Sequence, residues 1–243
     1  MREAPRAFAG ASVAVRVPLD ALMRRLPAPD PRAPAALGER RARALEALQA
    51  EGAVEPVFAY RIVALDAAGP DALVADGRRL HAPQLLPPSG TLEAVGIVVC
   101  TLGAGVERRV RAYFTARRPS SALALEGLAN ELLFALADRA QERLTLTALR
   151  GGRTVAGELR PGDPGMDLGA QSDLLGLAEA HAIGVRATAG GALSPLASST
   201  SVHGVGRGLP AATWSRCDRC PSAPRCALRA RQLAAAGARE GDA

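Results

Sequence analysis

The chain has 243 residues, of which 48% are hydrophobic, 22% charged and 3% aromatic. This composition excludes a disordered or collagen-like protein, and the length allows one main domain with a buried core. The formal net charge of +6 comes from 30 arginines and no lysine, scattered among 24 acidic residues. Because a scattered, arginine-only charge is typical of a GC-rich genome, it is weak evidence for nucleic-acid binding, which we do not expect.

The N-terminal residues, from Met1 to Arg6, are mostly polar or proline and form no signal-peptide core. No stretch approaches the roughly eighteen uninterrupted apolar residues that a membrane span needs. We therefore expect a cytoplasmic protein without a membrane partner. Three of the four cysteines lie near the C-terminus, a distribution that favours a metal or cluster site over a disulfide scaffold.

Proline and alanine dominate residues 1–36, which predicts an N-terminal arm with one short strand at 12–17. Beyond it, hydrophobic periodicity and turn residues predict alternating helices and strands. The predicted elements are a helix at 37–49, a strand at 54–65, a hairpin at 73–80, a strand at 96–100 and a helix that carries Val106, Val110 and Phe114. The run at 96–100 is wholly apolar, so we expect a strand buried on both faces.

A long helix is predicted from a cap at residues 119–121 to about residue 144. Its leucines recur at spacings of three and four, which is the pattern of a core-facing surface. They are Leu125, Leu128, Leu132 and Leu136. Phe134 lies instead on the polar side, with Asn130, Asp138 and Gln141, and this position indicates a contact with either a neighbouring loop or a ligand.

Two Pro-Gly units within six residues predict an irregular loop over 150–167, which either is solvated or binds a ligand. After it we predict a helix at 171–182, a strand at 184–188 and a second polar loop at 193–201. Gly204, Gly206 and Gly208 then lead to the cysteines.

Four segments in this order resemble the activation domain of cobalamin-dependent methionine synthase, in its short stand-alone form with a cysteine-rich C-terminus. They are the strand and turn at 98–103, the helix at 128–143, the loop at 160–165, and the pair of segments at 183–188 and 195–198. The resemblance implies an α+β domain with a curved, mixed, largely antiparallel sheet and flanking helices. We place this domain at 37–208, between the arm at 1–36 and a cysteine-rich segment at 209–243.

The resemblance also implies a function. The chain would assist the reductive reactivation of cobalamin, with S-adenosylmethionine as the methyl donor. Its partner would be a corrinoid-binding methionine synthase or a related methyltransferase component, and the electron would come from a reductase, a flavodoxin or a ferredoxin. Whether the chain is itself an enzyme stays open, although the resemblance favours a component of methyltransferase activity.

Site residues follow from the same resemblance. In the loop, Arg160 would pair with the carboxylate of the methionine moiety, and Gly165 would let the backbone approach the ligand. Pro164 belongs to the same loop, and Met166 stands where the family has a tyrosine.

The remaining site residues lie outside that loop. Phe134 replaces a glutamate that contacts the cofactor in the family, and a phenylalanine offers only its surface and its quadrupole to a cation. His203 stands where some relatives have a tyrosine, and Ala197 and Ser198 complete the predicted site.

The three C-terminal cysteines form the pattern C-x2-C-x5-C among arginines: Cys217, Cys220 and Cys226. Two thiolates at the first spacing can bind one metal, and the nearby arginines favour the thiolate form. The pattern fits an iron-sulfur cluster, a zinc site or free thiols. Zinc needs a fourth ligand, for which Asp218, His203 and Cys100 are the candidates, although Cys100 fits a buried strand position better.

A second function stays open beside the first. In it the chain is a non-catalytic interaction module that kept the fold, lost the S-adenosylmethionine site through the changes at Phe134 and Met166, and holds a structural zinc knuckle. His81 and His181 have no partner at ligand spacing and are expected to be structural.

Overall fold

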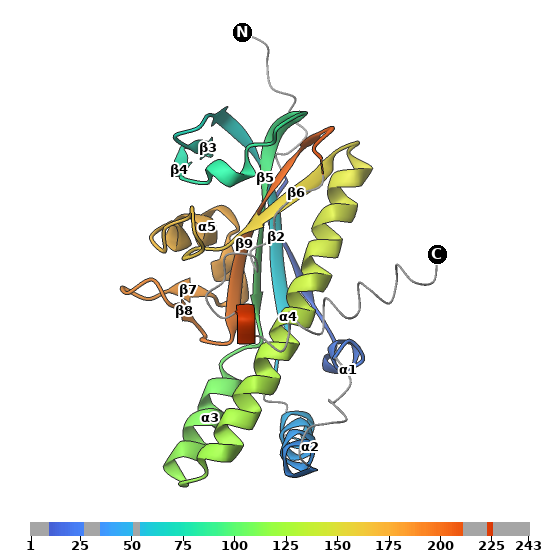
Figure 1. Ribbon diagram of the computed structural model, residues 1–243, viewed down its shortest axis with the longest axis vertical. Coiled ribbons are helices and arrows are strands. Elements are labelled where there is room, and N and C mark those ends of the chain that lie inside the picture. The colour runs from blue at the N-terminus through green and yellow to red at the C-terminus, as the bar shows by residue number, and fades with distance from the viewer. Residues whose placement is uncertain (1–9, 27–34, 51–53, 211–222, 226–243) are drawn as a thin grey trace.

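The computed structural model describes residues 10–26, 35–50, 54–210 and 223–225. They form an antiparallel sheet of seven strands in the order β4-β3-β2-β5-β9-β6, and β1 pairs with β2 beside this path (Figure 1). The strands are β1 (Val13–Arg16), β2 (Val57–Ala68), β3 (Leu73–Ala75), β4 (Arg78–Leu80), β5 (Thr91–Thr101), β6 (Thr154–Leu159) and β9 (Ser198–Arg207). A separate two-stranded sheet pairs β7 (Arg186–Ala187) with β8 (Leu193–Ser194).

Helices cover both faces of the large sheet. The α-helices are α1 (Leu19–Met23), α2 (Ala35–Ala50), α3 (Gly105–Thr115), α4 (Pro119–Arg150) and α5 (Ala170–Leu177). Three 3-10 turns are η2 (Pro83–Leu85), η3 (Ala180–Ile183) and η5 (Ala223–Arg225). The expected α+β class with a largely antiparallel sheet is therefore confirmed, and in the described residues every strand pairing is antiparallel.

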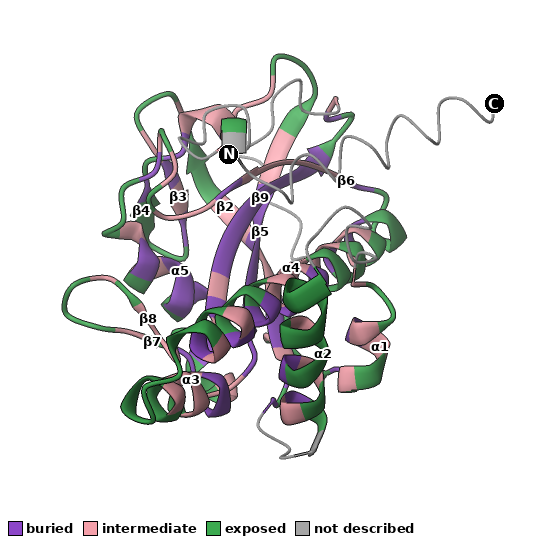
Figure 2. Cartoon of the chain, turned by 60° about the horizontal axis from the view of Figure 1, so that its bottom comes forward, coloured by how far each residue is buried: buried purple, intermediate pink, exposed green. Residues whose placement is uncertain are grey.

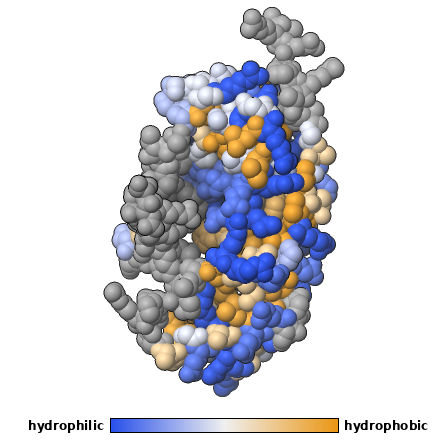
Figure 3. All heavy atoms as spheres, turned by 90° about the vertical axis from the view of Figure 1, so that its right-hand side faces the viewer, coloured by the Kyte–Doolittle hydropathy of each residue, from blue (hydrophilic) through white to orange (hydrophobic). Residues whose placement is uncertain are grey.

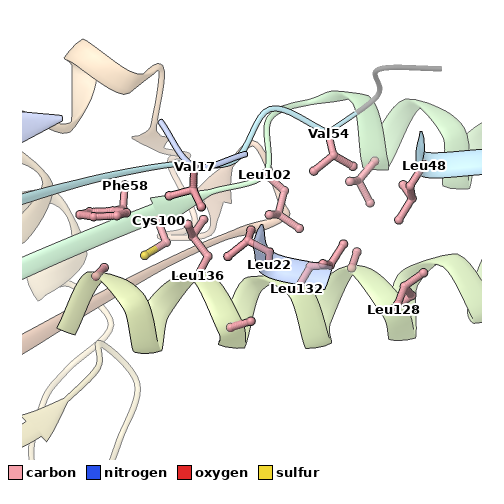
Figure 4. Packing of buried hydrophobic residues seen from close by; sticks show 14 of the residues in the cluster. Val17, Leu22, Leu48, Val54, Phe58, Cys100, Leu102, Leu128, Leu132 and Leu136 are labelled. Carbon is pink, nitrogen blue, oxygen red and sulfur yellow. The ribbon is translucent and has the colours of Figure 1, made fainter. Parts of the chain in front are cut away.

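The centre of the sheet is β5, which is buried along residues 94–101 (Figure 2). Its apolar side chains point to both faces, so the expectation of a doubly covered strand is confirmed. One core lies between the sheet and α4, where the four predicted leucines are all buried. Figure 4 shows Leu128, Leu132 and Leu136 in this core. The other core lies between the sheet and α5, and includes Val99 and Val202. The sheet thus separates two apolar layers.

Two segments that the sequence predicts as loops are strands. β6 lies within the predicted loop 150–167, and β9 begins within the predicted loop 193–201. β9 is rich in serine, threonine and glycine, which are poor strand signals, but its buried hydroxyl groups find hydrogen-bond partners. Thr200 Oγ1, for example, accepts a hydrogen bond from Gln171 Nε2 at 2.7 Å.

The predicted strand at 12–17 is confirmed as β1, and it pairs with β2. α1 follows it directly and buries Leu22 completely in the core on the α4 side. Residues 13–23 are therefore part of the packed domain, although the sequence places them in the arm.

α4 has the length and composition of a helix that could cross a membrane. Its leucines and alanines, however, form a stripe that packs against the sheet and against α2 and α3. On the face that Figure 3 presents, hydrophobic patches are interrupted by hydrophilic residues. Packing within the domain therefore explains the apolar character of this helix.

Candidate functional site

The polar side of α4 faces the end of the sheet formed by β6 and β9. In β6, Leu159 points into the core on the α5 side, so its neighbours Glu158 and Arg160 point toward α4. Cys100 of β5 packs in the core on the α4 side, and it lies opposite Ser199 of β9. Because side chains alternate along a strand, Ser201 and His203 of β9 also point toward α4. We call this line of contact between α4 and the two strands the α4 seam.

Arg160 is the central cation of the seam. Its Nε and Nη2 both lie 2.8 Å from Oε1 of Glu158. Its guanidinium carbon also lies 5.8 Å from the centre of the Phe134 ring, within the range of a cation–π contact. The sequence-predicted residues Phe134 and Arg160 are therefore brought together, and a cation of the chain itself already occupies one face of the ring.

Further carboxylates surround this group. Asp138 lies one helical turn beyond Phe134 and reaches solvent, yet its pKa is raised. The largest cause is the partial loss of hydration, followed by the nearby carboxylates Glu158 and Glu142, whereas Arg25 and Arg160 act in the opposite direction. The side chains of the seam next to Phe134 thus carry more negative than positive charge, which favours a cationic group at this place.

His203 lies buried at the back of the seam. Its Nδ1 is 2.9 Å from the carbonyl oxygen of Gly157, and its Nε2 is 3.1 Å from Oγ of Ser201. Burial lowers the pKa of His203, with Arg160 adding to the effect and Glu158 opposing it. Because both ring nitrogens have hydrogen-bond partners, His203 links β9 to Gly157 of β6. In this conformation it has no free lone pair that could bind zinc.

A groove continues the seam toward α3. It measures about 340 Å³ and lies between α3, α4 and residues 196–197. From α4 it takes Glu126 and Asn130, which precede Phe134 by two turns and one turn. From α3 it takes Phe114, whose side chain is 49% exposed. Ala197, a predicted site residue, also lines the groove.

Ser198 lies next to the groove but is mostly buried. Its Oγ donates to Oγ1 of Thr101 at 2.8 Å, and the same Thr101 oxygen accepts from the backbone N–H of Gly103 at 3.0 Å. Ser198 therefore anchors the chain where β5 and β9 meet the groove.

The loop after β6 folds on itself. Arg160 N–H donates to Asp163 Oδ2 at 2.9 Å, and Met166 N–H donates to the Asp163 carbonyl at 3.0 Å. Met166 is 2% exposed and packs in the core on the α5 side, away from the seam. The side chain of Met166, a predicted site residue, is therefore not part of the α4 seam.

The backbone conformation and a neighbouring side chain both favour glycine at position 165. Its φ is +93°, and an added Cβ would lie 2.8 Å from Nε2 of Gln84. Pro164, Gly165 and Met166 line an open hollow together with His81, which the sequence did not connect with this loop. The space beside the Gly165 backbone is thus occupied by the side chain of the chain's own Gln84.

The predicted cysteine site at Cys217, Cys220 and Cys226 lies outside the described residues. Within the part of the chain that the structure describes, no group of three or more histidine, cysteine or acidic side chains could hold a metal ion. Cys100 is completely buried in β5, and burial raises the pKa of its thiol to about 12. It is a core residue, as the sequence indicated.

Sequence reasoning missed Glu158, the partner of Arg160, because it placed residues 150–167 in a loop. The alternation of Val155, Gly157 and Leu159 with Thr154, Ala156 and Glu158 was too weak a signal for a strand. It also missed the groove residues Phe114 and Glu126, whose approach depends on how α3 packs against α4.

Comparison with solved structures identifies a similar fold. A crystal structure of the MetH reactivation domain bound to AdoHcy matches with a TM-score of 0.60 and 15% sequence identity, covering 86% of this chain and 83% of that chain. No family model matches the sequence, and a search of curated proteins finds no match. At this identity the likeness establishes a shared fold.

Proposed function

We propose that this chain is an accessory protein for a corrinoid methyltransferase of the methionine synthase type, and that it binds an S-adenosyl ligand along the α4 seam. The observation that carries the proposal is the likeness, over most of both chains, to a reactivation domain bound to AdoHcy. The seam supports it, because it combines an arginine, an aromatic ring and an adjoining groove on one helix face.

The two ends of such a ligand match two parts of the site. The groove, with Phe114 as its exposed ring, suits an adenine, and Asn130 and Glu126 offer hydrogen bonds to ribose hydroxyls. Glu126 and Phe134 are eight residues apart along α4, or about 12 Å, so an extended ligand in the groove reaches Arg160 with its carboxylate. Asp138 and Glu158 then lie where they favour the sulfonium and ammonium charges.

The reaction would use one external electron. A low-potential one-electron donor such as a flavodoxin or a ferredoxin reduces cobalt(II) of the partner's cobalamin to cobalt(I). Cobalt(I) then attacks the methyl carbon of S-adenosylmethionine, so that a Co–C bond forms and the S–CH3 bond breaks. The electron pair of the broken bond stays on sulfur and leaves neutral AdoHcy. This chain would contribute positioning and charge stabilisation.

A complementation experiment tests this proposal. A cobalamin-dependent methionine synthase that lacks its own reactivation domain is oxidised to the cobalt(II) state and supplied with S-adenosylmethionine and a chemical reductant. We expect the full chain, added in trans, to restore the visible spectrum of methylcobalamin and turnover, and Arg160→Gln to lose most of this effect. An unchanged cobalt(II) spectrum with the full chain would contradict the proposal.

The alternative function, a non-catalytic interaction module, is favoured by a different observation. Glu158 already satisfies Arg160, and Met166 is turned into the core. In that case S-adenosylmethionine would not bind, and the cysteines would hold a structural zinc ion.

For the cysteine segment we propose an iron-sulfur cluster ahead of zinc. A cluster with three cysteine ligands suits a chain that works beside a one-electron donor in the reducing cytoplasm.

A further inference from the structure

The turn between α3 and α4 is strongly basic. Within residues 105–118 there are five arginines and a single acidic residue, Glu107. The Glu107 carboxylate accepts a hydrogen bond from the backbone N–H of Leu196 at 2.9 Å, so it is turned toward the groove. Figure 1 shows α3 and the start of α4 extending beyond the end of the sheet. We call residues 105–123 the α3–α4 tip.

Two of these arginines are held in place by one ring. The guanidinium carbons of Arg109 and Arg118 each lie 5.3 Å from the centre of the Tyr113 ring. The Arg118 N–H also donates to the Tyr113 carbonyl at 2.8 Å, which closes the turn around the ring. Side chains fixed in this way lose less conformational entropy when they bind an anionic partner.

The other arginines of the tip point to solvent. Arg108, Arg111 and Arg117 are exposed, and none of them forms an ion pair within the described residues. α4 begins at this place without an acidic residue in its first turn, so the positive end of the helix adds to the charge. The result is a concentrated positive potential on a projecting part of the molecule.

Exposed apolar side chains lie beside these arginines. Phe114 is 49% exposed, Leu123 is 60% exposed, and Leu196 across the groove is 69% exposed. Arginines mixed with aromatic and aliphatic side chains are the composition of protein interfaces. A nucleic-acid site would instead favour a longer basic stripe that follows a backbone.

We propose that the α3–α4 tip is the docking surface for a partner protein with an acidic surface. Arg108, Arg117 and Arg118 steer and orient the partner, and Leu123, which lies outside the groove, supplies apolar contact. The tip borders the groove through Arg111 and Phe114, so a partner docked here lies beside the ligand end of the α4 seam. Docking at the tip depends on its charge and exposure, and it does not require that S-adenosylmethionine binds.

Binding to a flavodoxin, chosen as an acidic redox protein, tests the proposal by isothermal titration with the full chain. The test variant is the triple change Arg108→Gln, Arg117→Gln and Arg118→Gln. The matched control removes equal charge from the exposed part of α4, through Arg139→Gln, Arg143→Gln and Arg150→Gln. Thermal unfolding of each variant checks that the fold is kept.

We expect flavodoxin to bind at ~50 mM salt, to weaken strongly at ~300 mM, and to bind the tip variant about tenfold less tightly than the control variant. Equal loss in both variants would mean attraction to net charge alone and would overturn the proposal. An absence of binding by the unchanged chain would also overturn it. So would tighter binding of duplex DNA than of flavodoxin, with the same dependence on the tip arginines.

Discussion

Glu158 and Arg160 lie two positions apart at the end of β6, and a single carboxylate oxygen of Glu158 is 2.8 Å from both Nε and Nη2 of Arg160. The arginine that we assign to the ligand carboxylate is therefore paired with a carboxylate of the chain itself. Both side chains are about one-fifth exposed, so this pair is not a surface ion pair of negligible strength. Ligand binding on the α4 seam must exchange one carboxylate for another.

This exchange predicts the effect of Glu158→Gln. AdoHcy carries no sulfonium charge, so removal of the competing carboxylate should tighten its binding, by about three- to tenfold. S-adenosylmethionine should gain less, because Glu158 also attracts its sulfonium. Isothermal titration with both ligands measures the difference, with Glu46→Gln on the exposed side of α2 as the control. Weaker binding of AdoHcy to Glu158→Gln would contradict the exchange.

His203 predicts a pH dependence of stability. Its pKa is lowered in the folded protein from 6.5, so below about pH 6.5 the unfolded chain binds a proton that the folded chain resists. The free energy of unfolding should therefore fall as the pH drops through this range, before the carboxylates titrate. Urea unfolding between about pH 5.5 and 8 should show this slope, and His203→Gln should flatten it. The exposed His181→Gln should keep the slope, and a flat profile for the unchanged chain would refute the prediction.

Substitution by alanine should have opposite effects on stability at two glycines, Gly206 and Gly127. A Cβ at Gly206 would lie 1.9 Å from the carbonyl oxygen of Thr91, where β5 and β9 approach closely. Gly206→Ala should therefore destabilise the fold by about 2 kcal/mol or more. Gly127 lies in α4 with no atom within 4 Å of an added Cβ, so Gly127→Ala should stabilise by about 0.5–1 kcal/mol. Denaturant midpoints compare the two, and equal effects would contradict the packing at β5 and β9.

If the cysteine segment holds an iron-sulfur cluster, the purified protein should be coloured. Anaerobically purified chain should absorb broadly near 400 nm, as cysteine-ligated iron-sulfur centres do, with matching iron and sulfide contents. Cys220→Ala removes one ligand of the close pair and should remove iron and sulfide together. Stoichiometric zinc in a colourless protein would instead support the structural knuckle of the alternative function.

Much of the fold could be predicted from patterns along single segments. The apolar run of β5 and the leucine stripe of α4 are strong local signals, and each has the burial that its pattern indicates. β9 could not be predicted in this way, because its serines and threonines are satisfied only by partners far along the chain, such as Gln171. The limits of β6 and β9 depend on pairing rather than on propensity.

Likewise, only some residues of the candidate site could be predicted from the sequence. Phe134 stood out in the sequence as an aromatic residue on a polar helix face, and its partner Arg160 lay in a loop that the resemblance marked. Met166 could not be placed, because the direction of its side chain depends on the turn that Asp163 stabilises. The groove beside Phe114 exists only once α3 packs against α4, and no single segment encodes it.

Isothermal titration of S-adenosylmethionine shows whether the α4 seam binds this ligand, when it is carried out with the full chain, with Arg160→Gln and with the exposed control Arg143→Gln. We expect micromolar binding to the full chain and to the control, and at least about tenfold weaker binding to Arg160→Gln. The absence of heat at millimolar ligand with the full chain, or equal affinity for all three proteins, would contradict a ligand site on the α4 seam.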